Sequence, residues 1–139
     1  MKRRILIVDD DSDFTTILRE RLEYSGYETV SVSNGLAAIR LLNNGQHNAS
    51  VTGILLDVQM PVMNGLQTLG HLQKRFSHIP VLMMSSVSQP GIVEESLRLG
   101  AAAFLRKSEP SSKFLARCKQ VFGYDEGQVA GDETSSSNP

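Results

Sequence analysis

The chain has 139 residues, of which 40% are hydrophobic and 21% are charged, a composition typical of a globular domain. This length fits one domain with a buried core, and no apolar run approaches the ~20 residues of a membrane span, so neither a transmembrane helix nor a signal peptide is predicted. The formal net charge is −1, but residues 124–139 hold 4 acids and no base. The remaining 14 bases and 11 acids give residues 1–123 a net charge of +3. This charge is too small to indicate nucleic-acid or membrane binding.

Five short apolar runs predict β-strands, at residues 4–8, 28–32, 53–58, 80–84 and 102–105. The first, third and fourth runs are almost continuously apolar, which is typical of strands buried on both faces of a parallel sheet. Each run is followed by a stretch with apolar residues at helical spacing. The alternation predicts an α/β fold in which helices cover both faces of a parallel sheet.

The limits of the domain can also be predicted. Ser12 is the expected N-cap of the first helix, and Gly26 is its expected stop. The predicted domain covers residues 1–123. Residues 124–139 have no hydrophobic periodicity and are rich in acids and serine, so a disordered tail is predicted there.

Polar residues follow the predicted strands at one edge of the sheet. They are Asp9 and Asp10 after the first strand, Asp57 near the end of the third, Ser85 at the end of the fourth and Lys107 after the fifth. Ligand sites of open α/β sheets form at the carboxyl ends of strands. Of the five aspartates in residues 1–124, four lie between 9 and 13 and the fifth is Asp57, a distribution typical of a compact site of oxygen ligands.

Each of these residues alone has a simpler interpretation. Asp11 and Asp13 fit the N-terminus of the first helix, where a carboxylate can cap amide groups and is favoured by the helix dipole. Asp57 alone can equally be a solvated loop acid, and Lys107 alone a surface lysine. These interpretations do not explain why carboxylates and an ammonium group come together at one edge of the sheet.

Carboxylates in this arrangement suit a hard divalent cation such as Mg²⁺, which binds one or two carboxylates together with waters and phosphate oxygens. A carboxylate can also be the nucleophile that forms an acyl phosphate, and a metal with Lys107 would neutralise the charge of the transferring phosphoryl group. Other chemistries lack their motifs: the sequence has no G-x-x-x-x-G-K-[ST], G-x-G-x-x-G, CxxC, HExxH or G-x-S-x-G. The single cysteine, Cys118, is predicted to be a buried thiol, and the cytoplasm is the expected compartment.

Four pieces of the sequence, ILIVDDD, LLDVQMPVMNGL, IPVLMMSS and GAAAFLRK, occur in the order and at the spacing of a known family. Over residues 3–123 the chain resembles the receiver domain of two-component response regulators. The resemblance implies a flavodoxin-like, doubly wound sheet of five parallel strands in the order 2-1-3-4-5. It also implies that a histidine kinase or phosphotransfer protein donates a phosphoryl group from a phosphohistidine.

The resemblance assigns roles to the residues at the strand ends. Asp57 corresponds to the phosphoacceptor. Asp9 and Asp10 correspond to the acidic pair that holds Mg²⁺, for which Mn²⁺ can substitute, with Asp57 and the backbone carbonyl of Gln59 as further ligands. Lys107 corresponds to the lysine that contacts the phosphoryl group.

Two further residues correspond to a conformational switch. Ser85 matches the switch Ser/Thr and Phe104 the aromatic residue that rotates with it. The surface expected to change is formed by the fourth helix, the fifth strand and the fifth helix, and it is expected to bind a downstream effector or a second copy of the chain. The family commonly has Lys-Pro after the fifth strand, whereas this sequence has KSEP. A trans bond between Lys107 and Ser108 is therefore predicted, because a cis bond without proline costs ~2.5–4 kcal/mol.

Three functions of different classes fit these observations. The leading one is a phosphorylation-switched signalling module that catalyses only its own phosphorylation and dephosphorylation. The second is a phosphorylation-independent interaction module, against which the intact set of site residues argues. The third is a phosphatase of the haloacid-dehalogenase type, suggested by the D-x-D of residues 9–11, but that template needs a larger chain and Thr or Val in place of Asp13. A stand-alone receiver and a piece of a longer regulator fit the sequence equally well.

Overall fold

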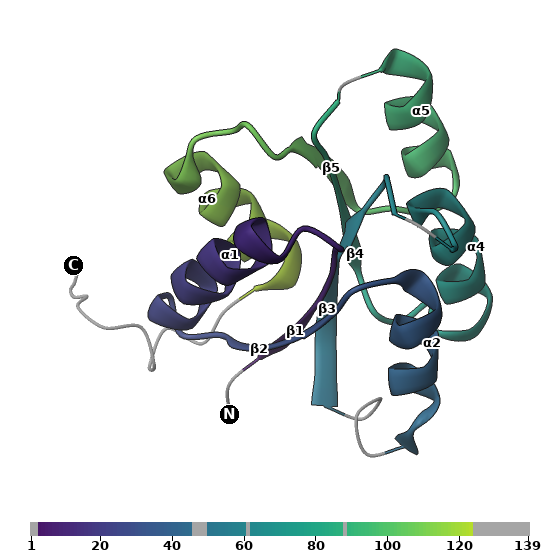
Figure 1. Cartoon of the computed structure of the whole chain (residues 1–139), viewed down its shortest axis with the longest axis horizontal. Coiled ribbons are helices and arrows are strands. Elements are labelled where there is room, and N and C mark those ends of the chain that lie inside the picture. Colours follow the sequence, from purple (N-terminus) through teal and green to yellow (C-terminus); the bar gives the residue numbers. More distant parts are fainter. Residues whose placement is uncertain (1–2, 46–49, 61, 88, 124–139) are drawn as a thin grey trace.

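The computed structural model of the chain describes residues 3–45, 50–60, 62–87 and 89–123. In these residues five strands alternate with five helices (Figure 1). The strands are β1 (Arg4–Val8), β2 (Glu28–Val32), β3 (Val51–Asp57), β4 (Val81–Ser85) and β5 (Ala103–Arg106). The helices are α1 (Ser12–Tyr24), α2 (Gly35–Asn43), α4 (Gly65–Arg75), α5 (Pro90–Arg98) and α6 (Ser111–Phe122). The predicted tail at 124–139 lies outside the described residues, so the limits of the domain stay a prediction.

All strand pairs are parallel, and the order across the sheet is β2-β1-β3-β4-β5, as predicted. The order reverses direction between β1 and β3, so their carboxyl ends flank the point where a crevice forms in such sheets. Strand β3 begins at Val51, two residues before the predicted start. The early start follows from pairing with β1, since Arg4 lies opposite Val51 and its amide donates to the Thr52 hydroxyl at 3.1 Å.

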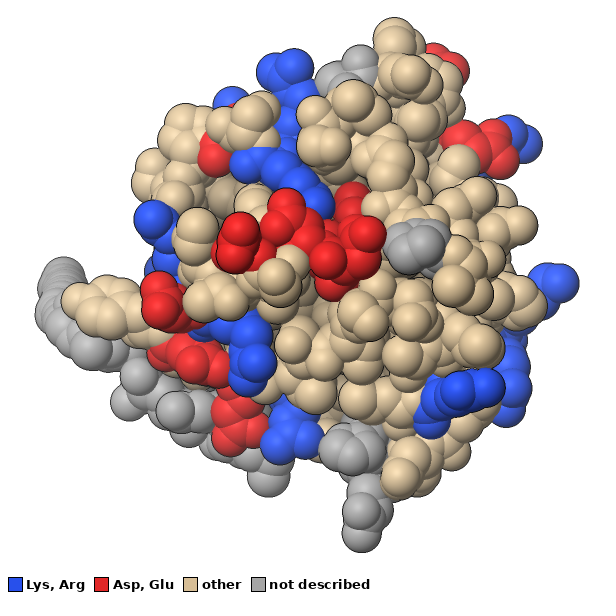
Figure 2. Space-filling view, viewed as in Figure 1, with Lys and Arg blue, Asp and Glu red and all other residues tan. Residues whose placement is uncertain are grey.

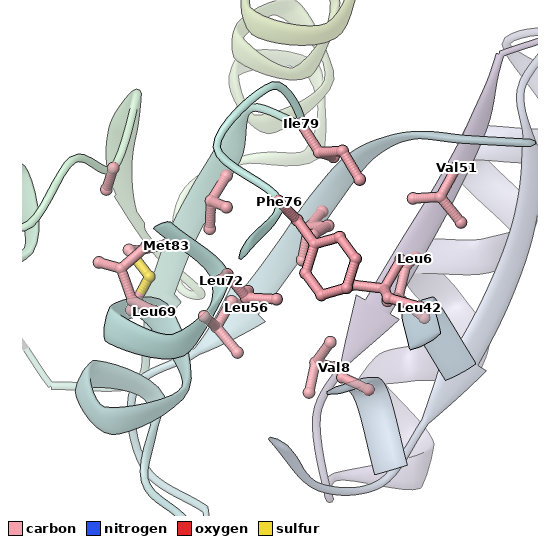
Figure 3. Close-up of a cluster of buried hydrophobic side chains, with 14 of the residues drawn as sticks. Leu6, Val8, Leu42, Val51, Leu56, Leu69, Leu72, Phe76, Ile79 and Met83 are labelled. Carbon is pink, nitrogen blue, oxygen red and sulfur yellow. The ribbon is translucent and has the colours of Figure 1, made fainter. Parts of the chain in front are cut away.

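Helices cover both faces of the sheet, with α1 and α6 on one face and α2, α4 and α5 on the other (Figure 1). Each face has its own buried cluster of hydrophobic side chains. Figure 3 shows the cluster between the sheet and α2 and α4, in which the labelled side chains are Leu6, Val8, Leu42, Val51, Leu56, Leu69, Leu72, Phe76, Ile79 and Met83. No helix in the described part of the chain is long and apolar enough to cross a membrane.

The N-cap of α1 is Asp11 and not Ser12, so that detail of the prediction was wrong. The Asp11 carboxylate accepts a hydrogen bond from the Phe14 amide at 3.1 Å, and the Asp11 amide donates to the Asp9 carboxylate at 2.9 Å. The second bond holds Asp11 in the extended conformation that an N-cap requires. Asp13 lies in the first turn, so both acids serve the helix terminus as predicted.

A glycine lets α4 begin directly against the end of β3. The Gly65 amide donates to the Val58 carbonyl at 2.8 Å, and the preceding residue, Asn64, caps the helix through a capping box with Gln67. A Cβ atom on Gly65 would lie 2.2 Å from the backbone oxygen of Asp57, a contact too close for any other residue. The absence of a side chain at this position therefore fixes the path of the backbone that carries Asp57.

Gly65→Ala is expected to lower the free energy of unfolding by about 1–3 kcal/mol, because the added methyl group must displace backbone and not a flexible side chain. Gly70→Ala is the matched control in the same helix. A Cβ at Gly70 meets nothing within 4 Å, so that change should raise stability by about 0.5–1 kcal/mol through helix propensity. Urea unfolding of both variants tests the account, and equal effects of the same sign would contradict it.

Candidate functional site

The fold brings the predicted site residues to one edge of the sheet. Asp57 and Ser85 are the last residues of β3 and β4, while Asp9 and Lys107 directly follow β1 and β5. The strand pairing continues into these positions, because the Lys107 amide donates to the Ser85 carbonyl at 2.8 Å and the Asp9 amide to the Val32 carbonyl at 3.1 Å. Backbone hydrogen bonds therefore set the separation of these side chains.

Three carboxylates gather at this edge. One oxygen from each of Asp9, Asp10 and Asp57 lies within 4.8 Å of the others. Asp9 is 4% exposed and Asp57 is 3% exposed, whereas Asp10 faces solvent. Figure 2 shows a patch of acidic side chains on this face of the molecule, with a basic side chain against it. Carboxylates this close repel one another unless a cation neutralises them.

Lys107 supplies part of that compensation. Its Nζ atom lies 2.7 Å from Asp9 Oδ2 and 3.5 Å from Asp57 Oδ2. Burial alone would lower the pKa of the ammonium group, but the hydrogen bond to Asp9 and the charges of Asp57 and Asp9 outweigh burial and raise this pKa. The group also lies 4.8 Å from the centre of the Phe14 ring, a further favourable contact for a cation. Lys107 is therefore held charged between the two buried acids.

The charged form of Asp57 remains unfavourable despite this lysine. Burial first, and the negative charge of Asp9 second, raise the pKa of Asp57 from 3.8 to about 7, while the charge of Lys107 opposes the shift. One oxygen, Asp57 Oδ1, is buried without a hydrogen-bond partner among the described residues. A buried acceptor in this state is costly and gains much from a positive ligand.

The residues present fit a hard metal ion. Oxygen ligands alone, with one carboxylate open to solvent and one unpartnered buried oxygen, are the donor set that suits Mg²⁺ rather than zinc. Asp10 lines two open hollows of about 520 Å³ each. One is lined by Gln59 and Met60, and the other by Asp9 and Ser12. The acidic cluster could therefore bind a cation together with a ligand of phosphate size.

The predicted switch residues have other contacts than the carboxylates and Lys107. Ser85 is completely buried, and its hydroxyl donates to Gln59 Oε1 at 3.0 Å and accepts from the Val87 amide at 3.1 Å. Phe104 is half-buried on β5 opposite Met83 and packs against the hydrophobic cluster of the α4 and α5 face. The roles of both residues, and that of the Gln59 carbonyl as a metal ligand, stay predictions.

The loop after β5 keeps an ordinary backbone. No peptide bond in the described residues is cis, so the predicted trans bond between Lys107 and Ser108 is confirmed. Lys107 reaches Asp9 and Asp57 all the same, because the pairing of β5 with β4 continues to its amide. The displaced proline of KSEP, Pro110, instead precedes α6 as its N-cap residue.

Sequence reasoning missed two contacts of the site. Phe14 was not predicted as a site residue, although its ring lies beside the Lys107 ammonium group. Gln59 was singled out for its backbone, whereas its side chain holds the Ser85 hydroxyl. Neither contact has a sequence signal of its own, since each depends on the rotamer of one long side chain.

Comparisons with known proteins agree with this geometry. A profile described as the response regulator receiver domain matches residues 5–119. The CpxR homolog of Haemophilus influenzae, a transcriptional regulatory protein, is 35% identical over 118 residues, which are 85% of this chain and 49% of that protein. The polar-differentiation response regulator DivK of Brucella anthropi is 30% identical over 125 residues, which cover 88% of this chain and 98% of that protein.

Solved structures show the same fold. A CheY-like response regulator receiver domain protein from Methanospirillum hungatei superposes with a TM-score of 0.79 at 25% identity, covering 86% of this chain and 93% of that one. The chain spans about half the length of several curated relatives that it matches. The chain belongs to the response regulator receiver domain family of two-component systems.

The raised pKa of Asp57 predicts a pH dependence of stability in the absence of divalent cations. The folded protein keeps the Asp57 proton to higher pH than the unfolded chain, so the stability that protonation contributes is complete below about pH 4 and is lost as the pH rises through about 7. Asp57→Asn removes this titration. Between pH 5 and 8 the free energy of unfolding of the wild type should fall relative to Asp57→Asn by an amount on the order of a few kcal/mol.

Urea unfolding in the presence of a chelator measures both curves. Taking their difference removes the titration of groups that the two proteins share. Parallel curves across this pH range would show that Asp57 titrates normally in the folded state.

Proposed function

We propose that Asp57 accepts a phosphoryl group from the phosphohistidine of a histidine kinase or phosphotransfer protein. An Asp57 oxygen attacks phosphorus, the bond from phosphorus to the donor imidazole nitrogen breaks, and the released nitrogen takes up the lost electron pair and then a proton. The observation that supports this most directly is the buried Asp57 carboxylate, with one unpartnered oxygen, 3.5 Å from Lys107 and beside Asp9 and Asp10.

Asp9, Asp10, Asp57 and the backbone carbonyl of Gln59 would hold Mg²⁺, which when bound supplies positive charge to the phosphoryl oxygens and to the nucleophile. Lys107 can pair with the negative charge both before and after the phosphoryl group is transferred. Before transfer it pairs with Asp57, and after transfer its ammonium can pair with a phosphoryl oxygen while Asp9 keeps it oriented at 2.7 Å.

The phosphoryl group would act on a partner through Ser85 and Phe104. A hydrogen bond from the Ser85 hydroxyl to a phosphoryl oxygen would draw the end of β4 inward and leave space that the Phe104 ring can enter. Burial of an aromatic side chain is worth ~1.5–3 kcal/mol, enough to bias an equilibrium between two states. The altered face is that of α5, β5 and α6, where Leu97 is 48% exposed and Arg106 faces solvent. This face would bind a downstream effector or a second copy of the chain.

The protein would turn over no separate metabolite, so it would not be an enzyme apart from its own phosphorylation and dephosphorylation. A phosphorylation-independent interaction module is not favoured, because such a module does not need two buried carboxylates and a lysine held together at a cost to stability. The cytoplasm, where a kinase partner would be met, remains the predicted compartment.

The phosphoacceptor can be tested with a small phosphodonor. In Mg²⁺ and acetyl phosphate, the wild type should gain one phosphoryl group that hydroxylamine releases, and Asp57→Asn should gain none. Intact-mass spectrometry measures both. Asp13→Asn is the matched control, since Asp13 belongs to the same acidic run but lies in the first turn of α1, and it should be phosphorylated like the wild type. Equal incorporation in Asp57→Asn would refute the assignment.

The switch can be separated from phosphorylation by Ser85→Ala. This variant keeps the acceptor and the proposed metal ligands, so it should still accept phosphate, but it should lose most of the phosphorylation-induced amide shifts around Phe104. Two-dimensional NMR of the ¹⁵N-labelled protein measures the shifts. Ser86→Ala is the control, because Ser86 is exposed and next to the switch position. Shifts of wild-type size in Ser85→Ala would break the proposed coupling.

A further inference from the structure

The hydroxyl group of Ser85 is already engaged in the described structure. It donates its one hydrogen to Gln59 Oε1 at 3.0 Å and accepts from the Val87 amide at 3.1 Å. Ser85 itself is completely buried, whereas Gln59 is exposed and lines the hollow beside Asp10. The contact thus joins a buried hydroxyl group to a long, solvent-exposed side chain at the edge of the acidic cluster.

A serine hydroxyl has only one hydrogen to donate. Under the proposed function, Ser85 must donate it to a phosphoryl oxygen on Asp57, so the bond to Gln59 has to break first. The Val87 amide can remain bound to the same oxygen throughout, because it uses a lone pair and not the hydrogen. Gln59 and the phosphoryl group therefore compete for one proton donor.

We propose that Gln59 is a positioning residue, whose side chain holds the Ser85 hydroxyl group away from the phosphoryl position. Gln59 thereby sets how far phosphorylation of Asp57 shifts the equilibrium between the two states of the switch. This inference rests on the proposed function. It concerns the side-chain amide alone, whereas the predicted metal ligand at this residue is the backbone carbonyl.

The size of the effect follows from the exposure of Gln59. When Ser85 leaves, the Gln59 amide can hydrogen-bond to water, so the net cost of breaking the contact is that of an ordinary hydrogen bond, a factor of about 2–10 in an equilibrium constant. Such a factor can tune the balance between two states without blocking either one.

Beryllium fluoride with Mg²⁺ is a suitable probe, because it mimics a phosphoryl group on a carboxylate and binds reversibly. The variants are Gln59→Met, which keeps the length of the side chain but accepts no comparable hydrogen bond, and Ser85→Ala, alone and combined with Gln59→Met. Ser85→Thr, alone and with Gln59→Met, is the conservative pair that retains the hydroxyl. Amide shifts give the dissociation constant of beryllium fluoride in each protein, and Mg²⁺ alone is titrated in parallel.

Gln59→Met should bind beryllium fluoride about 2–10 times more tightly than the wild type when both are compared at a Mg²⁺ concentration that saturates each protein. The gain should persist with Ser85→Thr and vanish with Ser85→Ala, as a double-mutant cycle requires for a direct contact. The Val87 amide resonance should also move in unliganded Gln59→Met, because its acceptor has lost a partner.

Unchanged or weaker binding in Gln59→Met, or an equal gain with Ser85→Ala, would overturn the inference while leaving the proposed function intact. A wild type that binds no beryllium fluoride in Mg²⁺ would instead refute the proposed function, and this inference would fall with it.

Discussion

The ion pairs of Lys107 with Asp9 and Asp57 are the interaction on which the site depends. Two buried carboxylates and a third at the surface offer oxygens within 4.8 Å of one another, and a single ammonium group cannot neutralise them all. The remaining negative charge destabilises the unliganded protein and is available to a cation. The parallel sheet is what makes this arrangement rigid, because hydrogen bonds between strands fix the backbone at Asp9, Asp57 and Lys107.

The same arrangement links stability to chemistry. Asp57 is buried against Asp9 with a pKa of about 7, so its anion, which is the nucleophilic form, is also the form that the unliganded fold tolerates least. A bound cation would lower that pKa and recover the stability. Gly65 also contributes, because α4 begins directly against the backbone of Asp57. A Cβ atom at position 65 would lie 2.2 Å from the Asp57 carbonyl oxygen, so only a residue without a side chain fits there. Under the proposed function, phosphorylation would act on a carboxylate whose negative charge the unliganded protein compensates only in part.

The sequence was informative where a pattern recurs along the chain, or where one residue type is restricted to a few positions. Continuous apolar runs predicted the parallel strands, and aspartates confined to strand ends predicted the cluster of Asp9, Asp10 and Asp57. Details that depend on one hydrogen bond were not accessible in this way. The choice of Asp11 over Ser12 as N-cap depends on the bond from its amide to Asp9, and the contact between Gln59 and Ser85 depends on a single rotamer. Val62, with φ of 72°, adopts a left-handed conformation that its β-branched side chain would not predict.

Our central inference is that these carboxylates form a cation site and therefore repel one another while no cation is bound. Thermal unfolding of the wild type and of Asp10→Asn, each with a chelator and with Mg²⁺, tests it directly. Asp10→Asn should unfold at a higher temperature than the wild type in the chelator, since one repulsive charge is gone, and should lose most of the rise that Mg²⁺ gives the wild type. Asp13→Asn, outside the cluster, should keep that rise. An Asp10→Asn variant that is less stable in the chelator, or that keeps the full Mg²⁺-dependent rise, would contradict the claim.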